Sequence, residues 1–289
     1  MKKTYPIVII VLLFFITACN QGKQEDVFQR HIQLSGQSNF RDIGGYTNNS
    51  GETIQTGIVF RSGTLSKLTT EDVNIIDSLE IKTVVNFLTT EEIAGRGEDN
   101  LPEGVHSIFL PISGENDEAA AVLQARETGD FSAVPIELNY NIHALLVDVG
   151  KNSYKGLFEV LADADNYPVV FHCSHGVHRT GTATALLFLA LDIPWDAIAS
   201  DYMLSNTYRY EESNKRIQAL NQLAQTNSEI TDKDENLKNI QAFYQLEKKY
   251  IEGTREVIEN QYGDIQNYLV TIGVDSATIE RVKNNLLSQ

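Results

Sequence analysis

The sequence contains little cysteine and little positive charge. Only two of its 289 residues are cysteines, Cys19 and Cys173, which excludes a multi-disulfide scaffold. The 23 Lys and Arg residues are outnumbered by 39 Asp and Glu residues, which gives a formal net charge of −16. Such a surface repels nucleic-acid backbones and anionic lipids, so we expect neither to be bound by it. An anionic ligand would need a local positively charged site, because the negative charge of the whole protein repels it.

Membrane-spanning runs are also absent. The apolar run over residues 7–16 has ten residues, whereas a spanning helix needs about 20. It follows Lys2 and Lys3 and ends just before a small residue, Ala18. This order of charge, short apolar run and small residue predicts a secretory signal peptide over residues 1–18.

The end of that segment, Ile16-Thr17-Ala18-Cys19, resembles the lipobox of bacterial lipoproteins. The resemblance implies that Cys19 becomes a lipidated N-terminus, followed by a polar tether over residues 19–30. We therefore expect an exported protein of the cell envelope that meets the membrane through this lipid only. A plain signal peptide with an incidental cysteine is the alternative.

The remaining chain, residues 31–289, has no repeat or Pro/Gly-rich linker and is predicted to form one domain. Strands are predicted over residues 57–61, 81–88, 105–110 and 168–171, with helical segments between them. This alternation predicts an α/β fold with a central, mostly parallel sheet flanked by helices. Beyond Thr182 the segments look helical, over residues 183–191, 195–206, 213–223, 236–261 and 277–287. They predict a helical C-terminal cap from about residue 207.

A ten-residue loop joins the buried strand at 168–171 to an apolar helix. It reads His172-Cys173-Ser174-His175-Gly176-Val177-His178-Arg179-Thr180-Gly181. A strand–loop–helix turn directs successive backbone N–H groups into one concavity, which suits phosphate oxygens. The amides of residues 174–179 are therefore predicted to bind phosphate. The planar guanidinium of Arg179 would grip two of its oxygens.

The same donors would stabilise a thiolate at Cys173 and lower its pKa from about 8.5. Attack on phosphorus would give a cysteinyl-phosphate that water then cleaves. Thr180 could donate its hydroxyl to the sulfur, and His172 is a second candidate to support the thiolate. This chemistry requires no metal and no other cofactor.

Three other interpretations of the loop remain open. His172, Cys173, His175 and His178 could form a zinc cluster, although zinc sites rarely include an Arg-Thr-Gly helix start. Cys173 and a histidine could form a thiol-protease pair, which would leave Arg179 without a role. The loop could also bind phosphate without turnover.

The loop fits the pattern HCxxGxxRTG, and the chain resembles the bacterial tyrosine-phosphatase-like family that includes secreted mycobacterial and listerial phosphatases. Further similar segments are NFRDIGGY at 39–46, FRSGTLSKLT at 60–69 and DYMLSN at 201–206. The resemblance implies a phosphomonoester hydrolase acting on phosphorylated substrates, foremost a protein-tyrosine phosphatase. An inositol-phosphate or phosphoinositide phosphatase and a non-catalytic phosphate-binding lipoprotein are the alternatives.

The chain also departs from that family. Members often carry Gly-Lys-Asp-Arg in the loop, where this chain has Gly176-Val177-His178-Arg179. The general acid that protonates the leaving oxygen is therefore open, and our candidates are Glu115, Asp117 and His178, in that order. His175 and His178 could also lend positive charge to the rim.

Several other residues outside the loop are expected to be structural. Asp42 is predicted to accept hydrogen bonds beside its glycine pair, and Arg41 and Arg61 to pair with carboxylates under the sheet. The aromatic residues of the C-terminal region are predicted to be core: Tyr202, Tyr208, Tyr210, Phe243, Tyr244 and Tyr250.

Overall fold

The computed structural model describes residues 30–113 and 116–288, without the side chains of residues 116–120. The predicted signal peptide, Cys19 and Glu115 lie outside the described residues, as does all of the predicted tether except Arg30. Arg30 already contacts the fold. Its guanidinium donates to the Gly44 carbonyl and lies 3.9 Å from the centre of the Tyr46 ring. No helix in the described part of the chain is both long and apolar enough to cross a membrane.

The main sheet has five strands in the order β1-β3-β6-β4-β5. These are β1 Arg41–Asp42, β3 Val59–Ser62, β6 Val169–His172, β4 Thr83–Asn86 and β5 His106–Phe109. Only β1 runs antiparallel to its neighbour, so the predicted mostly parallel sheet is confirmed. A small pair, β2 Thr53–Ile54 with β7 Leu287–Ser288, was not predicted.

The two faces of the sheet are filled by alternate residues of its central strands. Phe60, Val170 and Val84 are in register and belong to a smaller core that also contains Ile76 of helix α2. Their neighbours Phe171 and Val85 face the larger core, which is built from the helices on the other side. A strand buried on both faces needs a continuous apolar run, and this explains the composition of residues 168–171.

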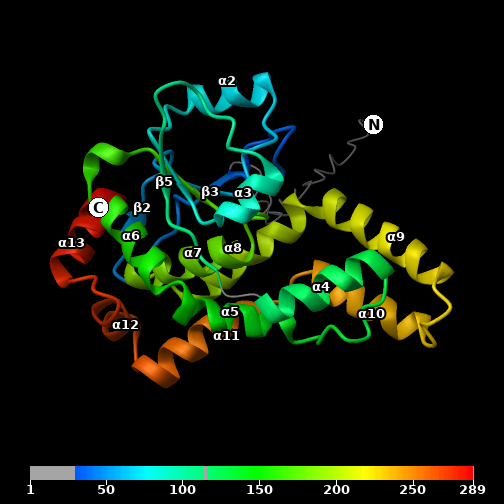
Figure 1. Ribbon diagram of the computed structural model, residues 1–289. Coiled ribbons are helices and arrows are strands. Elements are labelled where there is room, and N and C mark those ends of the chain that lie inside the picture. The colour runs from blue at the N-terminus through cyan, green and yellow to red at the C-terminus, as the bar shows by residue number, and fades with distance from the viewer. Residues whose placement is uncertain (1–29, 114–115, 289) are drawn as a thin grey trace, which may run out of the picture.

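The helices cover both faces of the sheet and extend beyond it (Figure 1). Their bounds are α2 Thr70–Ser78, α3 Thr90–Arg96, α4 Asn116–Thr128, α5 Leu138–Val149, α6 Lys151–Leu161, α7 His178–Ala190, α8 Trp195–Tyr208, α9 Tyr210–Thr226, α10 Lys233–Tyr244, α11 Lys248–Val257, α12 Ile265–Thr271 and α13 Ser276–Leu286. A 3₁₀ turn, Ala164–Asn166, and a π-helical turn, Ile258–Tyr262, complete them. Figure 1 shows α4, α9 and α10 extending together to one side of the sheet.

The C-terminal helical region is present, with three differences from the prediction. The single helix expected over 236–261 is interrupted, because Gln245 and Glu247 have extended backbones that separate α10 from α11. Helix α12 was not predicted. Helix α7 begins at His178 rather than at residue 183, so the last part of the loop is its first turn.

Two arginines are buried where β1 meets β3. Arg41 and Arg61 face each other in register, and both pair with Asp201 of α8. Arg41 Nε lies 3.1 Å from Asp201 Oδ1, and Arg61 Nη1 lies 2.5 Å from Oδ2. All three side chains are at most 1% exposed. The predicted pairing with a carboxylate is confirmed. The predicted role of Asp42 is confirmed as well, since its oxygens accept from the amides of Gly44 and Gly57 at 2.7 Å.

The charge of Asp201 is held by its partners. Burial alone would raise the pKa of its carboxyl, but Arg41 and Arg61 outweigh burial and lower the pKa to about 2. Because the usual value is 3.8, the stability that the ionised form contributes is fully present above about pH 4. That contribution is lost as the pH falls through about 2.

We expect Asp201→Asn to lower the free energy of unfolding by about 3–5 kcal/mol, because two buried guanidinium groups lose their counter-charge. Urea unfolding at pH 7 measures this. Asp196→Asn, an exposed change in the first turn of the same helix, should cost less than about 1 kcal/mol. Equal stabilities of the two variants would contradict the assignment, as would a difference from the native chain that does not shrink toward pH 2.

Candidate active site

The loop after β6 lies at the carboxyl end of the parallel strands and borders a cavity of about 300 Å³. Cys173, which is 2% exposed, lines this cavity together with Ser174, His175, Val177, His178 and Arg179. The structure thus brings the signature residues to one pocket. Gly176 makes the tight turn possible: its φ is +68°, and a Cβ there would lie 2.6 Å from the Ser62 carbonyl oxygen.

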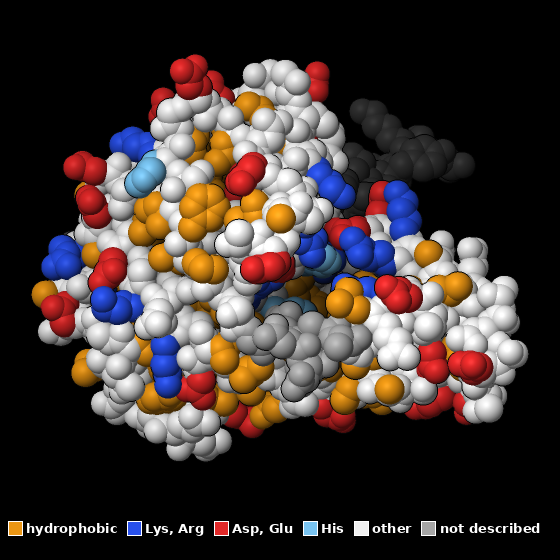
Figure 2. Space-filling view, viewed as in Figure 1, with side chains coloured by type: hydrophobic (Ala, Val, Ile, Leu, Met, Phe, Trp, Pro, Cys, Tyr) orange, Lys and Arg blue, Asp and Glu red, His pale blue; other side chains and the backbone are white. Residues whose placement is uncertain are grey.

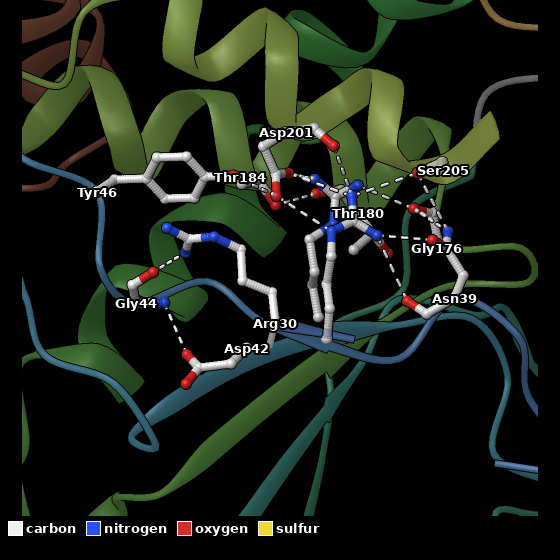
Figure 3. A network of polar contacts seen from close by, with 12 residues as sticks. Arg30, Asn39, Asp42, Gly44, Tyr46, Gly176, Thr180, Thr184, Asp201 and Ser205 are labelled. Carbon is white, nitrogen blue, oxygen red and sulfur yellow. Dashed lines mark hydrogen bonds and ion pairs between the residues drawn. The ribbon is translucent and has the colours of Figure 1, made fainter. Parts of the chain in front are cut away.

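The carbonyl groups of the loop are bound from behind. The Ser174 carbonyl accepts from the Thr64 amide at 3.2 Å, and the His175 carbonyl accepts from Asn39 Nδ2 at 3.0 Å. The Gly176 carbonyl accepts from Arg61 Nη2 at 2.9 Å, and Figure 3 shows Gly176 beside Asn39 in this network. Thr64, Asn39 and Arg61 do not line the cavity, so these hydrogen bonds hold the loop from outside it. The amides of His175 and Thr180 contact the sulfur.

The thiol of Cys173 is surrounded by donors. Burial alone would raise its pKa, but the charge of Arg179 opposes burial, as do the Thr180 hydroxyl and the amides of Thr180 and His175. Together they lower the pKa of Cys173 below its usual value. The predicted contact of Thr180 with the sulfur is therefore present. The sulfur carries negative charge at a lower pH than a free thiol does.

Arg179 is directed into the site and is 6% exposed. Its Nη1 and Nη2 donate to the two oxygens of Glu92 at 2.6 and 2.7 Å, in the bidentate geometry that suits a carboxylate. Nη1 also donates to the Phe87 carbonyl at 3.1 Å, and Nη2 to Ser174 Oγ at 3.4 Å. These contacts hold the guanidinium at the cavity wall.

Glu92 was not predicted as a site residue. It closes the capping box of α3, where its carboxylate accepts from the Thr89 amide at 3.0 Å while also pairing with Arg179. Burial would raise the pKa of Glu92, but the hydrogen bond and charge of Arg179 lower it. The available signal was Thr89-Thr90-Glu91-Glu92, a capping box directly after a parallel strand.

His172 does not contact the sulfur as its assigned role would require. Its Nε2 lies 2.9 Å from Asp99 Oδ2, and its Nδ1 lies 3.3 Å from the Cys173 carbonyl oxygen. Asp99 in turn accepts from the Leu65 amide and from Asn86 Nδ2. His172 therefore fixes the backbone at Cys173 rather than the thiolate itself.

His175 and His178 do not supply the expected positive charge. Burial, reinforced by the nearby Arg179, lowers the pKa of His178 to about 3. Burial and the charge of Arg209 hold the pKa of His175 well below its usual value. Both rings are neutral near pH 7. His178 Nε2 lies 2.8 Å from Asn139 Oδ1 and is its donor, because the amide nitrogen of Asn139 donates elsewhere.

The hydrogen-bond partners of the loop histidines argue against the zinc-cluster and thiol-protease interpretations of the loop. His172 and His178 are held by Asp99 and Asn139, so neither is placed for a zinc cluster or a thiol-protease pair. Among the described residues, no group of three or more His, Cys, Asp and Glu side chains is arranged to hold a metal ion. A histidine acts as a general acid in its protonated form, and His178 is neutral at pH 7. It is therefore not suited to protonate the leaving oxygen. Glu115 and the side chain of Asp117 lie outside the description.

The aromatic residues of the C-terminal region are only partly core. Tyr202, Tyr244 and Tyr250 are buried as predicted, whereas Tyr210 is 65% exposed. Phe243 and Tyr244, at the end of α10, line the cavity instead of packing only into the interior. The apolar side chains of Val122, Leu123, Leu138, Ile142 and Leu246 also line it.

A buried thiol of lowered pKa, amide donors around it and a guanidinium fixed beside it define a cysteine-dependent phosphatase. The chain matches the model of the tyrosine phosphatase family over residues 32–288 and belongs to that family. The protein is therefore a phosphatase of the tyrosine-phosphatase type that acts on phosphorylated substrates.

Two curated relatives are similar over most of their length. The triple specificity protein phosphatase PtpB of Mycobacterium tuberculosis is 25% identical over 88% of this chain and 98% of its own. A putative tyrosine-protein phosphatase of Cupriavidus necator is 24% identical over 80% of each chain. Among solved structures, the catalytic domain of the phosphatase SIW14 of S. cerevisiae matches 57% of this chain and 88% of its own. It does so at 14% identity and a TM-score of 0.31, which is too low to support an inference.

The Thr180 hydroxyl tests the origin of the lowered thiol pKa. We expect Thr180→Val to raise the pKa of Cys173, because the thiolate loses a donor that the neutral thiol hardly needs. The pH profile of alkylation by iodoacetamide should move to higher pH. Thr184→Val removes a hydroxyl one turn further along α7, where it donates to the Thr180 carbonyl, and should leave the profile in place. An unchanged profile in Thr180→Val would contradict the assignment.

Proposed function

We propose that the protein hydrolyses phosphotyrosine in peptides or proteins through a cysteinyl-phosphate intermediate. One observation carries the proposal: a thiol of lowered pKa lies in a cavity whose lining combines the predicted phosphate-binding loop with a set of apolar side chains. Val122, Ile142 and Phe243 suit the phenyl ring of tyrosine. An inositol ring would bring hydroxyl groups against the same apolar surface, at a desolvation cost.

In the proposed first step, the Cys173 sulfur attacks phosphorus and the bond to the tyrosine oxygen breaks. The amides of residues 174–179 and the guanidinium of Arg179 hold the three remaining phosphate oxygens. Thr180 keeps its hydroxyl on the sulfur, which is the leaving group of the second step. Water then attacks phosphorus, the sulfur–phosphorus bond breaks and phosphate is released.

Glu92 has a positioning role in this scheme. Glu92 fixes the guanidinium of Arg179 at the cavity wall before the substrate binds. This lowers the entropic cost of binding phosphate through the guanidinium. The incoming phosphate must share the guanidinium with this carboxylate.

The covalent step is tested with p-nitrophenyl phosphate. We expect Cys173→Ser to lose activity by more than about 10⁴-fold, because a hydroxyl at this position is not ionised near pH 7. Trapping of a phosphorylated protein by rapid acid quench should succeed only with the native chain. Ser174→Ala, which changes the neighbouring loop residue and removes one contact with Arg179, is the matched control and should retain most activity.

Two outcomes would redirect the proposal. Equal activity of the native chain and Cys173→Ser would exclude a cysteinyl-phosphate. Inactivity of both, with phosphate still bound, would favour the non-catalytic phosphate-binding alternative. A chelator added to the native enzyme should change nothing, since no step uses a metal.

For the leaving-group proton, we propose a carboxylic acid, Glu115 or Asp117. The acid variant, Glu115→Gln or Asp117→Asn, should lower kcat on phosphotyrosine by about 10²–10⁴-fold. It should lower kcat on p-nitrophenyl phosphate much less, because p-nitrophenolate leaves without a proton. Glu118→Gln, in the same acidic run, is the control. Equal losses on both substrates would contradict acid catalysis by that residue.

A further inference from the structure

The cavity collects arginines that the loop motif does not include. Arg96 in the last turn of α3, Arg126 in the last turn of α4 and Arg209 between α8 and α9 line it together with Arg179. Figure 2 shows Lys and Arg side chains around a hollow that contains histidine and hydrophobic side chains. In a chain with 23 cations against 39 carboxylates, four arginines on one cavity are a local reversal of the field.

Two of these arginines, Arg96 and Arg126, have no ion-pair partner in the described part of the chain, whereas Arg179 pairs with Glu92 and Arg209 with Glu212. Glu92 is the only acidic side chain among the described residues that line the cavity, and it pairs with Arg179. No carboxylate of the described residues lies within 4.0 Å of Arg96 or Arg126. Arg126 donates its Nε to the Tyr244 hydroxyl at 3.2 Å, which fixes the group at the wall.

Two buried polar atoms at the same wall lack hydrogen-bond partners. Arg209, which is 5% exposed, has an Nε without one, although it lies 3.5 Å from a Glu212 oxygen. Nε2 of His175 is the second such atom. A buried polar atom without a hydrogen-bond partner is costly. Since Arg209 Nε is close to Glu212, the ring nitrogen of His175, a residue of the cavity lining, is the atom that points to a ligand group.

A second cavity, of about 530 Å³, adjoins the first. Tyr244 and Leu246 line both of them. Side-chain amides line this second space, among them Asn214, Gln241 and Gln245. Amides that both donate and accept suit an extended backbone. A polypeptide on either side of a phosphorylated ring fits this shape, whereas a small cyclic phosphate would leave the second cavity empty.

We propose that Arg96, Arg126 and Arg209 form an anion subsite that selects phosphotyrosine flanked by acidic side chains. The proposal rests on the function proposed above and adds a preference that the signature loop does not encode. The carboxylate next to the phosphotyrosine meets Arg96 and Arg126 at the rim. Arg209 and His175 provide the buried polar atoms behind them.

The experiment compares the double variant Arg96→Ala/Arg126→Ala with the native enzyme. Two peptides differ only in whether glutamate or alanine flanks the phosphotyrosine. We expect the native enzyme to prefer the acidic peptide and the double variant to reduce this preference in kcat/KM by about three- to tenfold. Raising the salt concentration should weaken the preference of the native enzyme in the same direction.

The matched control is Lys82→Ala/Arg281→Ala. It removes the same two charges from exposed positions, one before β4 and one in α13, that do not line either cavity. Its preference should equal that of the native enzyme. A similar loss in this control would show that only the net charge matters and would overturn the subsite.

The remaining outcomes separate the subsite from the proposed function. If the native enzyme cleaves both peptides equally well, the subsite fails and the function stands. If it cleaves neither peptide but hydrolyses p-nitrophenyl phosphate, the phosphotyrosine assignment itself fails. If the arginine pair matters only for a soluble inositol bisphosphate, the second anion is a phosphate and the acidic-peptide proposal is overturned.

Discussion

The site depends on one buried carboxylate. Asp201 holds the fully buried side chains of Arg41 and Arg61 together. Arg61 in turn donates to the Gly176 carbonyl of the loop. Two like charges on facing residues of a β pair would otherwise repel and lose their hydration. With Asp201 in place, they become fixed donors under the loop. The shape of the phosphate cradle therefore depends on Asp201 of helix α8, a residue outside the loop motif.

Charge compensation is repeated at the cavity itself. Arg179 lowers the pKa of Cys173, while Glu92 holds Arg179 and keeps that positive charge from being unopposed. The arrangement places a negative sulfur, a guanidinium and a carboxylate in sequence at a largely buried wall. The guanidinium stabilises the charged forms of both the sulfur and the carboxylate. In the proposed reaction, the phosphate binds beside the sulfur and the guanidinium.

Patterns that depend on neighbours in the chain were predictable from sequence. The caps at Thr69 and Thr89 and the turn at Gly176 follow from local residue types, and the order of strands follows from their alternation with helices. Glu92 was missed because its partner is 87 residues away, and a capping box explains the residue completely without it. The break in the helix predicted over residues 236–261 was missed because residues 245–247 contain no proline or glycine that would signal the end of a helix.

The histidines show why residue type alone does not settle a role. The sequence places three of them around Cys173, which suggests imidazole chemistry or positive charge. For His175 and His178, burial among arginines removes the positive charge, since a cation would have to form next to cations in a desolvated wall. The neutral ring of His178 contributes a hydrogen bond to Asn139 instead, and His172 is held by Asp99. Positive charge at this cavity therefore comes from arginine, whose ionisation survives burial, and the fold brings these arginines together from segments that no local motif connects.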